Sequence, residues 1–395
     1  MRPIPITELS PGQVLGTPIF NEKGELMLVS GFCMTEQVIN SMKRRGIHSV
    51  YIAEDLATEM KNITQEKMIS EELGDEVSAA FEKSQQRLQN DLRLDGLKPD
   101  AISDRIEELA KSSPLLNVKA IQKRVMAIIA EIVDKNITMF AAYPSKSARK
   151  EEHKHAIDVT LLSLLIAHHF KYVTKDFRTL GTSALLHDIG KSALIDLLNR
   201  PLEDLSSEER AVEMQHPAFS MQILQESETF TFVEQITIHQ HHEEADGSGY
   251  PQGLKSSGAS PNPAQTYNKK YIHYNAEILA VANTYDNLLN GSLLGKRHTP
   301  EEALVKIINQ QAGHWNEYVV KALVSTIQCY PRGACVRIVK TASERYDGYK
   351  GVVVKSNTNN PSKPTVCLTH NSLGNEIKPF IIDFGDEKEM ELELH

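Results

Sequence analysis

Cysteine and tryptophan are scarce in this sequence, with four cysteines and one tryptophan among 395 residues. Cys33, Cys329, Cys335 and Cys367 show no Cys-x-x-Cys spacing, and a chain of this length can fold without covalent cross-links. The pattern therefore argues against structural disulfides and against a thiolate zinc site. It favours a reducing, cytoplasmic compartment.

Long apolar runs and an excess of basic charge are also missing. The longest apolar stretch, Leu161 to Ala167, is far shorter than the ~20 residues that a membrane helix needs, and the first residues, MRPIPITELSPG, lack the apolar core of an export signal. The 43 basic residues are outnumbered by 52 acidic ones, for a formal net charge of −9. We therefore expect neither a membrane nor DNA as a partner, although a local basic pocket is compatible with this balance.

The periodicity of apolar residues changes along the chain and predicts four parts. Short β-like runs and one helix, at 35–45, occupy the start, and apolar residues recur every three or four positions from Ile102 to Ile132. Strand signals then almost vanish until about 331, after which alternating β-branched runs return. We predict a small α+β domain at 1–53, a helical connector region at 54–134, an all-α bundle at 135–331 and a small β-barrel-like extension at 332–395.

Nine of the 15 histidines lie between His153 and His242, and two sequence elements give the first of them a chemical context. Glu151 and His155 are four residues apart ahead of an apolar helix, so their side chains face the same way. His187 and Asp188 begin the sequence HDIGK, which ends in Lys191 and follows another apolar helix. An imidazole can fix one metal ion while the adjacent carboxylate bridges two, so this pair suits a site with several ions.

Two later elements add histidines of the same kind. His216 precedes a proline, and the adjacent His241 and His242 would point about 100° apart on a helix, toward different ions or toward one ion and a substrate oxygen. The glycine-rich turn from 246 to 251 brings backbone close to a ligand. Taken alone, the pair Glu151 and His155 is better interpreted as a solvated helix start, and His216 as an ordinary helix start; His216 gains weight only from the company of the other motifs.

These motifs in this order, HDIGK at 187–191, HP at 216–217 and HHE with DGSGYP from 241 to 251, resemble the HD-GYP family over about 135–331. The flanking parts resemble one subgroup, with a small N-terminal domain and a β extension after the YP-x-G turn at 330–333. The resemblance implies a mostly α protein built on an HD-type helical bundle. It also implies a bacterial phosphodiesterase that hydrolyses cyclic di-GMP to pGpG, and in some members to GMP, with two or three iron or manganese ions.

The resemblance also assigns roles by position. It implies metal ligands at Glu151, His155, His187, Asp188, His216, His241, His242 and Asn283. It implies a catalytic role for Asp188, which would bridge two ions, and for Lys191. It implies substrate contacts at Lys191, Arg200, Gly249, Tyr250, Pro251, Lys296 and Arg297. A hydroxide that bridges the ions would attack the phosphodiester in line, while the ions neutralise charge in the transition state.

The sequence departs from the family pattern on one helix. Asn283 replaces an aspartate ligand, and a neutral amide oxygen is a weaker donor to a metal. Asp286 either substitutes for that ligand or has a structural role. Glu277 stands where the family has an arginine, and the Arg-Pro-Tyr that usually follows the helix is absent, which leaves Lys296 and Arg297 as surrogate phosphate contacts.

A long loop between Leu254 and Glu277 is the third departure. Its Tyr267, Lys269, Lys270 and Tyr271 could cap a nucleotide by stacking and charge, or the segment could be a mobile surface loop. Three functions stay open: a cyclic di-GMP phosphodiesterase, a weak or inactive receptor for a cyclic dinucleotide, and a phosphodiesterase for cyclic GMP-AMP or linear pGpG. The N-terminal region could bind a protein partner or form a homodimer.

Overall fold

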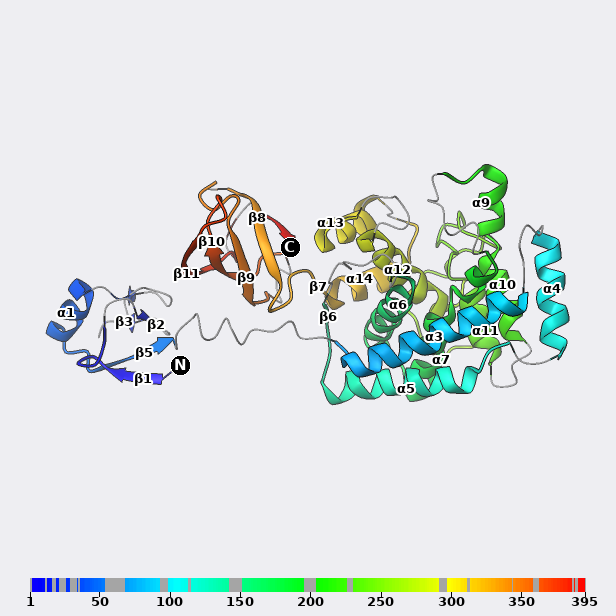
Figure 1. The fold of residues 1–395 in the computed structure, drawn as a ribbon, viewed down its shortest axis with the longest axis horizontal. Helices are drawn as coiled ribbons and strands as arrows, with labels where there is room; N and C mark the ends of the chain where they lie inside the picture. The colour runs from blue at the N-terminus through cyan, green and yellow to red at the C-terminus, as the bar shows by residue number, and fades with distance from the viewer. Residues whose placement is uncertain are drawn as a thin grey trace. The chain divides into compact units, whose positions relative to one another are not determined.

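A computed structural model of the chain describes residues 2–10, 13–15, 19–20, 26–28, 34, 36–53, 68–92, 99–112, 115–141, 151–194, 204–225, 230–290, 297–310, 313–342, 344–357, 362–385, 387 and 390–394. The chain divides into two units, residues 1–66 with 330–395, and residues 67–329 (Figure 1). The four-part division predicted from the sequence stays a prediction. In the parts of the chain that the structure describes, no helix combines the length and the apolar character needed to cross a membrane.

The N-terminal residues form a small α+β arrangement, as the sequence predicted. Strands β1 (Arg2–Pro5), β5 (Ser49–Ala53) and β2 (Val14–Leu15) form an antiparallel sheet in the order β1-β5-β2, and β3 (Ile19–Phe20) pairs with β4 (Leu26–Leu28). Helix α1 (Glu36–Arg44) supplies apolar side chains to the same core. That core contains Ile4, Leu15, Met34, Ile39, Met42 and Val50.

The C-terminal residues form a five-stranded antiparallel sheet, which confirms the predicted β extension. Its strands are β8 (Cys335–Thr341), β9 (Lys350–Lys355), β10 (Thr365–His370), β11 (Glu376–Asp383) and β12 (Met390–Leu394), in the order β11-β10-β9-β8-β12. Alternate residues on neighbouring strands, such as Val336, Ile338 and Val353, are buried on one side, which is the period-two pattern of a half-buried sheet.

Among the residues that the structure describes between 68 and 134, three helices lead into the bundle: α3 (Glu71–Leu92), α4 (Pro99–Ser112) and α5 (Val118–Asp134). Helices α3 and α5 run side by side (Figure 1). The apolar stripes of α4 and α5 are buried, with Ile106 on α4 and Val125 and Ile128 on α5 fully inaccessible, because residues three and four apart face the same side of a helix. These helices pack onto α6, α7 and α10 of the bundle.

The bundle surrounds two helices that are buried along most of their length, α6 (Glu151–Ala167) and α12 (Tyr274–Asn290). The others are α7 (Thr174–Leu186), α9 (Ser207–Glu213), α10 (His216–Gln225), α11 (Phe232–His239), α13 (Pro300–Val305), α14 (Glu317–Thr326) and the short turns η2 (Ile189–Leu194) and η4 (Lys306–Gln310). Capping boxes begin α9, α11 and α13, where a Ser or Thr hydroxyl and a Glu carboxylate satisfy backbone N–H groups. Two short strands, β6 (Phe140–Ala141) and β7 (Ile327–Gln328), pair in parallel and join the ends of the bundle.

Candidate metal centre

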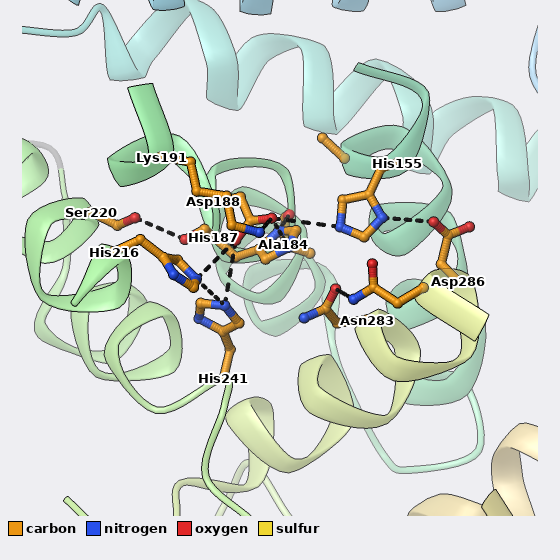
Figure 2. A network of polar contacts seen from close by, with 12 residues as sticks. His155, Ala184, His187, Asp188, Lys191, His216, Ser220, His241, Asn283 and Asp286 are labelled. Atoms are coloured by element: carbon orange, nitrogen blue, oxygen red, sulfur yellow. Dashed lines mark hydrogen bonds and ion pairs between the residues drawn. The ribbon is translucent and has the colours of Figure 1, made fainter. Parts of the chain in front are cut away.

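Four elements of the bundle bring the predicted ligands together around Asp188 (Figure 2). Helix α6 supplies His155, and the end of α7 supplies His187 followed by Asp188. Helix α10 begins with His216, and the turn after α11 carries the His241-His242 pair. The six side chains that the sequence predicts from four separate motifs therefore meet at one place.

The backbone fixes the orientation of three of these rings. Each Nδ1 atom lies 2.6–2.7 Å from the carbonyl oxygen three residues earlier in the chain, in His187, His216 and His241. A carbonyl oxygen can only accept a hydrogen bond, so Nδ1 carries a proton. When each ring is neutral, its Nε2 atom therefore holds a lone pair, which is the form that binds a metal ion.

The free ends of these rings converge on the two oxygens of Asp188. Its Oδ1 lies 3.2 Å from Nε2 of His216 and 3.6 Å from Nε2 of His241. Its Oδ2 lies 3.3 Å from Nε2 of His187 and 3.7 Å from Nε2 of His155. The carboxylate thus separates two groups of donors, His155 with His187 and His216 with His241 and His242, and belongs to both. This is the arrangement of a carboxylate that bridges two cations.

Unpartnered buried atoms show that this donor set suits metal ions. Nε2 of His187, Nε2 of His242 and Oδ1 of Asp188 are buried without a hydrogen-bond partner, and such atoms are costly unless an ion or water satisfies them. Burial lowers the pKa of His187, lowers that of His241 to about 3 and holds that of His242 well below its ordinary value. These rings are neutral at pH 7, as metal ligands must be.

Asp188 and Lys191 form an ion pair within the site. The Lys191 Nζ lies 2.6 Å from Asp188 Oδ2, and the Asp188 side chain is 13% exposed. Burial acts to raise the pKa of Asp188, but His187 and Lys191 hold it well below its usual range. The group shared by the two sets of donors is therefore a carboxylate at neutral pH.

A tight backbone contact sets the distance between the HDIGK segment and α10. The Gly190 N–H donates to Ser220 Oγ at 2.8 Å, and that hydroxyl donates to the His187 carbonyl at 2.8 Å. A Cβ atom on Gly190 would lie 2.3 Å from the His216 carbonyl oxygen. Only glycine fits here, and this position fixes His216 relative to Asp188. Ser220 had no signal in the sequence.

The glycine-rich loop folds back onto the histidines because Glu243 holds it. The buried Glu243 carboxylate accepts the N–H groups of Gln252 and Leu254, both at 2.7 Å. The Tyr250 ring lies flat on His242, with ring centres 4.6 Å apart and planes inclined by 14°. A Cβ on Gly249 would lie 2.4 Å from the His242 carbonyl oxygen. Gly249, Tyr250 and Pro251 therefore lie against the site, and Glu243 is a positioning residue that sequence reasoning missed.

Asp286 orients His155. Its Oδ2 accepts from His155 Nδ1 at 2.6 Å and from Asn290 Nδ2 at 2.8 Å, so His155 presents Nε2 to Asp188. Burial acts to lower the pKa of His155, but the hydrogen bond and charge of Asp286 outweigh it and raise that pKa. The sequence left open whether Asp286 replaces a metal ligand, and these contacts favour its structural role.

Replacing Asp286 with asparagine is expected to weaken metal binding by about 10- to 100-fold, which is the usual effect of removing a partner that orients a ligating histidine. The amide keeps an acceptor for His155 but loses the charge that strengthens the ring as a donor. Calorimetric titration of metal-free protein with Mn²⁺ measures the change. Wild-type affinity in the Asp286→Asn variant would contradict the role that we give to this carboxylate.

Of the remaining predicted site residues, the structure describes some and not others. Asn283 is buried on α12, and its Oδ1 accepts from Asn287 Nδ2 at 2.9 Å. Glu151 begins α6, one helical turn before His155, but its side chain lies outside the described residues. Arg200 and Lys296 also lie outside them, and Arg297 is exposed. The predicted roles of Glu151, Arg200, Lys296 and Arg297 stay predictions.

Glu277 is buried and anchors the long loop. Its carboxyl group accepts from Ser256 Oγ in the loop and from Asn316 Nδ2, at 2.9 Å, ahead of α14. Elsewhere in the loop, the Tyr267 hydroxyl accepts from Gln240 Nε2 at 3.0 Å. Glu277, which stands where the family has an arginine, therefore has a structural role: it holds the long loop in place.

A glutamine at position 277 is expected to make stability less sensitive to alkali. Burial raises the pKa of Glu277 to about 7, against the opposing effect of its hydrogen bonds from Ser256 and Asn316. The folded state thus holds this proton more tightly than the unfolded state, so stability falls as pH rises from the unfolded pKa through about 7. The loss is up to roughly 3 kcal/mol. Denaturation of wild type and Glu277→Gln at pH 5 and pH 8 measures the difference, and parallel pH profiles would contradict it.

Residues 67–329 fold mainly as a helical bundle that brings several histidines together around one aspartate, and this combination can be compared with known protein families. Residues 137–318 match the HD domain family. This match, together with the relatives described next, confirms the resemblance to the HD-GYP family that the motifs predicted. The helical core and the C-terminal sheet confirm the predicted fold class as well.

Three curated relatives have similar sequences. The cyclic di-GMP phosphodiesterase PA4108 of Pseudomonas aeruginosa is 29% identical over 195 residues, which cover 49% of this chain and 43% of that protein. The cyclic di-GMP phosphodiesterase response regulator RpfG of Xanthomonas campestris is 29% identical over 161 residues, 40% of this chain and 39% of its own. The 3'3'-cGAMP-specific phosphodiesterase 3 of Vibrio cholerae is 30% identical over 178 residues, 45% of this chain and 36% of its own. The matched part spans less than half of each relative.

Proposed function

We propose that this protein is a metal-dependent phosphodiesterase that hydrolyses cyclic di-GMP to pGpG. The observation that carries the proposal is the division of four histidine Nε2 atoms between the two oxygens of Asp188. A pair of cations held by one carboxylate suits in-line displacement at a phosphodiester. Proteins with similar sequences that are named cyclic dinucleotide phosphodiesterases support the same reaction.

Each residue of the site has a role in this reaction. His155, His187 and Asp188 would hold one divalent cation, and Asp188, His216, His241 and His242 would hold a second. Iron or manganese, when bound, would acidify a water molecule and neutralise charge on the phosphate. The local cation Lys191 would attract the anionic substrate to an otherwise acidic protein. Tyr250 and Gly249 would limit the space at the guanine end.

A second substrate deserves the same test because one relative is specific for 3'3'-cGAMP. This chain lacks the family's arginine at position 277, and the glutamate there is committed to the long loop. The contacts that select the bases therefore differ from the family pattern. A cyclic GMP-AMP phosphodiesterase is the second candidate.

The test is chromatography of the products after incubation with each dinucleotide. Protein purified without air and reconstituted with iron or manganese is expected to release pGpG or GMP and to contain at least two metal ions per chain. Preferential cleavage of cyclic GMP-AMP would select the second candidate. A His241→Ala variant is the inactive control, since it removes one ligand of the second cation. Tight binding of cyclic di-GMP without product would instead establish a receptor and contradict the proposal.

A further inference from the structure

Helix α12 carries a row of amide and carboxyl groups on one face, and Asp286 and Asn283 of this row lie beside the metal centre (Figure 2). Asn283, Asp286, Asn287 and Asn290 are three, four and seven residues apart, so they share one face of the helix. Asn287 Nδ2 donates to Asn283 Oδ1 at 2.9 Å, and Asn290 Nδ2 donates to Asp286 Oδ2 at 2.8 Å. In both hydrogen bonds the donor is the later residue and the acceptor is the residue four positions closer to the start of the helix.

This order fixes what Asn283 offers to the site. Its side chain is buried, with 3% exposure, and lies beside the histidines (Figure 2). The amide group is planar, so its oxygen and nitrogen point in different directions, and the oxygen is turned along α12 toward Asn287. The nitrogen is therefore the atom that faces the cluster (Figure 2). An amide nitrogen has two N–H donors and no lone pair for a cation.

We propose that Asn283 is a substrate-binding residue that donates Nδ2–H to a phosphate oxygen of the cyclic dinucleotide, rather than a metal ligand. The inference rests on the proposed function and deepens it. A phosphate oxygen accepts hydrogen bonds only, and a bond from a neutral donor to a charged acceptor is stronger than one between neutral groups. The prediction of Asn283 as a ligand, made from the family pattern, is replaced by this role.

The first experiment separates metal binding from substrate binding in the full-length, Mn²⁺-loaded protein. We expect the Asn283→Ala variant to retain the wild-type number of Mn²⁺ ions while KM for cyclic di-GMP rises about 10- to 100-fold. A His155→Ala variant is the matched control, because the loss of a true ligand must lower the Mn²⁺ content. Loss of one Mn²⁺ equivalent from Asn283→Ala would overturn the proposal.

A second variant turns the amide group without removing it. In Asn287→Asp the new carboxylate can only accept, so Asn283 must donate to it and present its oxygen to the site. We expect KM to rise as in Asn283→Ala, with Mn²⁺ affinity equal to or above wild type. An unchanged KM in both variants would show that the amide nitrogen does not contact the substrate.

Failure of the proposed function is distinguishable from failure of this inference. Calorimetry with cyclic di-GMP and the Mn²⁺-loaded protein measures binding even if turnover is absent, and a weaker Kd in both variants supports the hydrogen bond in that case. Wild-type protein that neither binds nor cleaves the dinucleotide overturns the function and the inference together. Wild-type turnover with an unaltered KM in Asn283→Ala overturns the inference alone.

Discussion

Replacing Asp188 with alanine is expected to empty both cation positions and to lower turnover by about 10³-fold or more. Asp188 is the one side chain shared by both groups of donors, and its two oxygens face Nε2 atoms from three helices and the turn after α11. Its removal also leaves Lys191 without its carboxylate, at a site lined by histidines. Quantification of metal and assay of product on the same sample measure both effects.

Asp134 provides a matched control for this experiment. It lies exposed at the end of α5, in the same unit but on a surface position, so Asp134→Ala is expected to keep wild-type metal content and activity. An Asp188→Ala protein that still bound two ions would show that the carboxylate is not a bridge. Retained turnover would remove the assigned mechanism.

Gly190→Ala is expected to lower Tm by about 5 to 10 °C and to reduce metal content, a cost of about 2 to 4 kcal/mol. The added methyl group would lie 2.3 Å from the carbonyl oxygen of His216 and 2.5 Å from the Ser220 nitrogen. Both are backbone atoms, so neither can rotate away, and the HDIGK segment must separate from α10. That movement breaks the two hydrogen bonds of Ser220 Oγ and shifts His216 away from Asp188. Thermal unfolding and metal analysis report the two consequences.

Gly74 offers the comparison for that substitution. It lies in helix α3 with ordinary space around it, because the nearest atom to an added Cβ, apart from the helix's own backbone, would be Ile69 Cδ1 at 3.8 Å. Alanine favours a helix over glycine by up to about 1 kcal/mol, so Gly74→Ala should leave Tm unchanged or slightly raised. Equal melting temperatures for wild type and Gly190→Ala would show that the contact is looser than the structure indicates.

Six of the predicted ligands could be located from the sequence because metal binding uses few residue types in short local patterns, and the structure brings these six side chains together. His187 with Asp188 and His241 with His242 are adjacent in the chain, and their chemistry is visible without the fold. The partners that orient them are not visible in this way. Asp286 lies 131 residues from the His155 ring that it binds, and no periodicity links such distant positions. The direction of the Asn283 amide depends on Asn287 and is likewise a property of the folded helix.

The fold was predictable where periodicity was strong and less so at strand edges. Helices α5 and α12 and strands β8 to β11 follow their patterns of apolar residues. The runs of β-branched and apolar residues did not single out strands β1 and β12. β1 contains two prolines, which an edge strand tolerates because one side needs no ladder hydrogen bonds. Strand β12, with the sequence MELEL, is an edge strand of the C-terminal five-stranded sheet. Its two alternating glutamates lie on the exposed side, where charge suits a sheet edge.

The central claim is that Asp188 joins two cations in one site, and electron paramagnetic resonance of protein loaded with two equivalents of Mn²⁺ tests it most directly. Two Mn²⁺ ions that share a carboxylate are magnetically coupled, so the account predicts a coupled-pair spectrum in wild type that is lost in Asp188→Ala. A wild-type spectrum of isolated Mn²⁺ ions, the same in both proteins, would contradict the account.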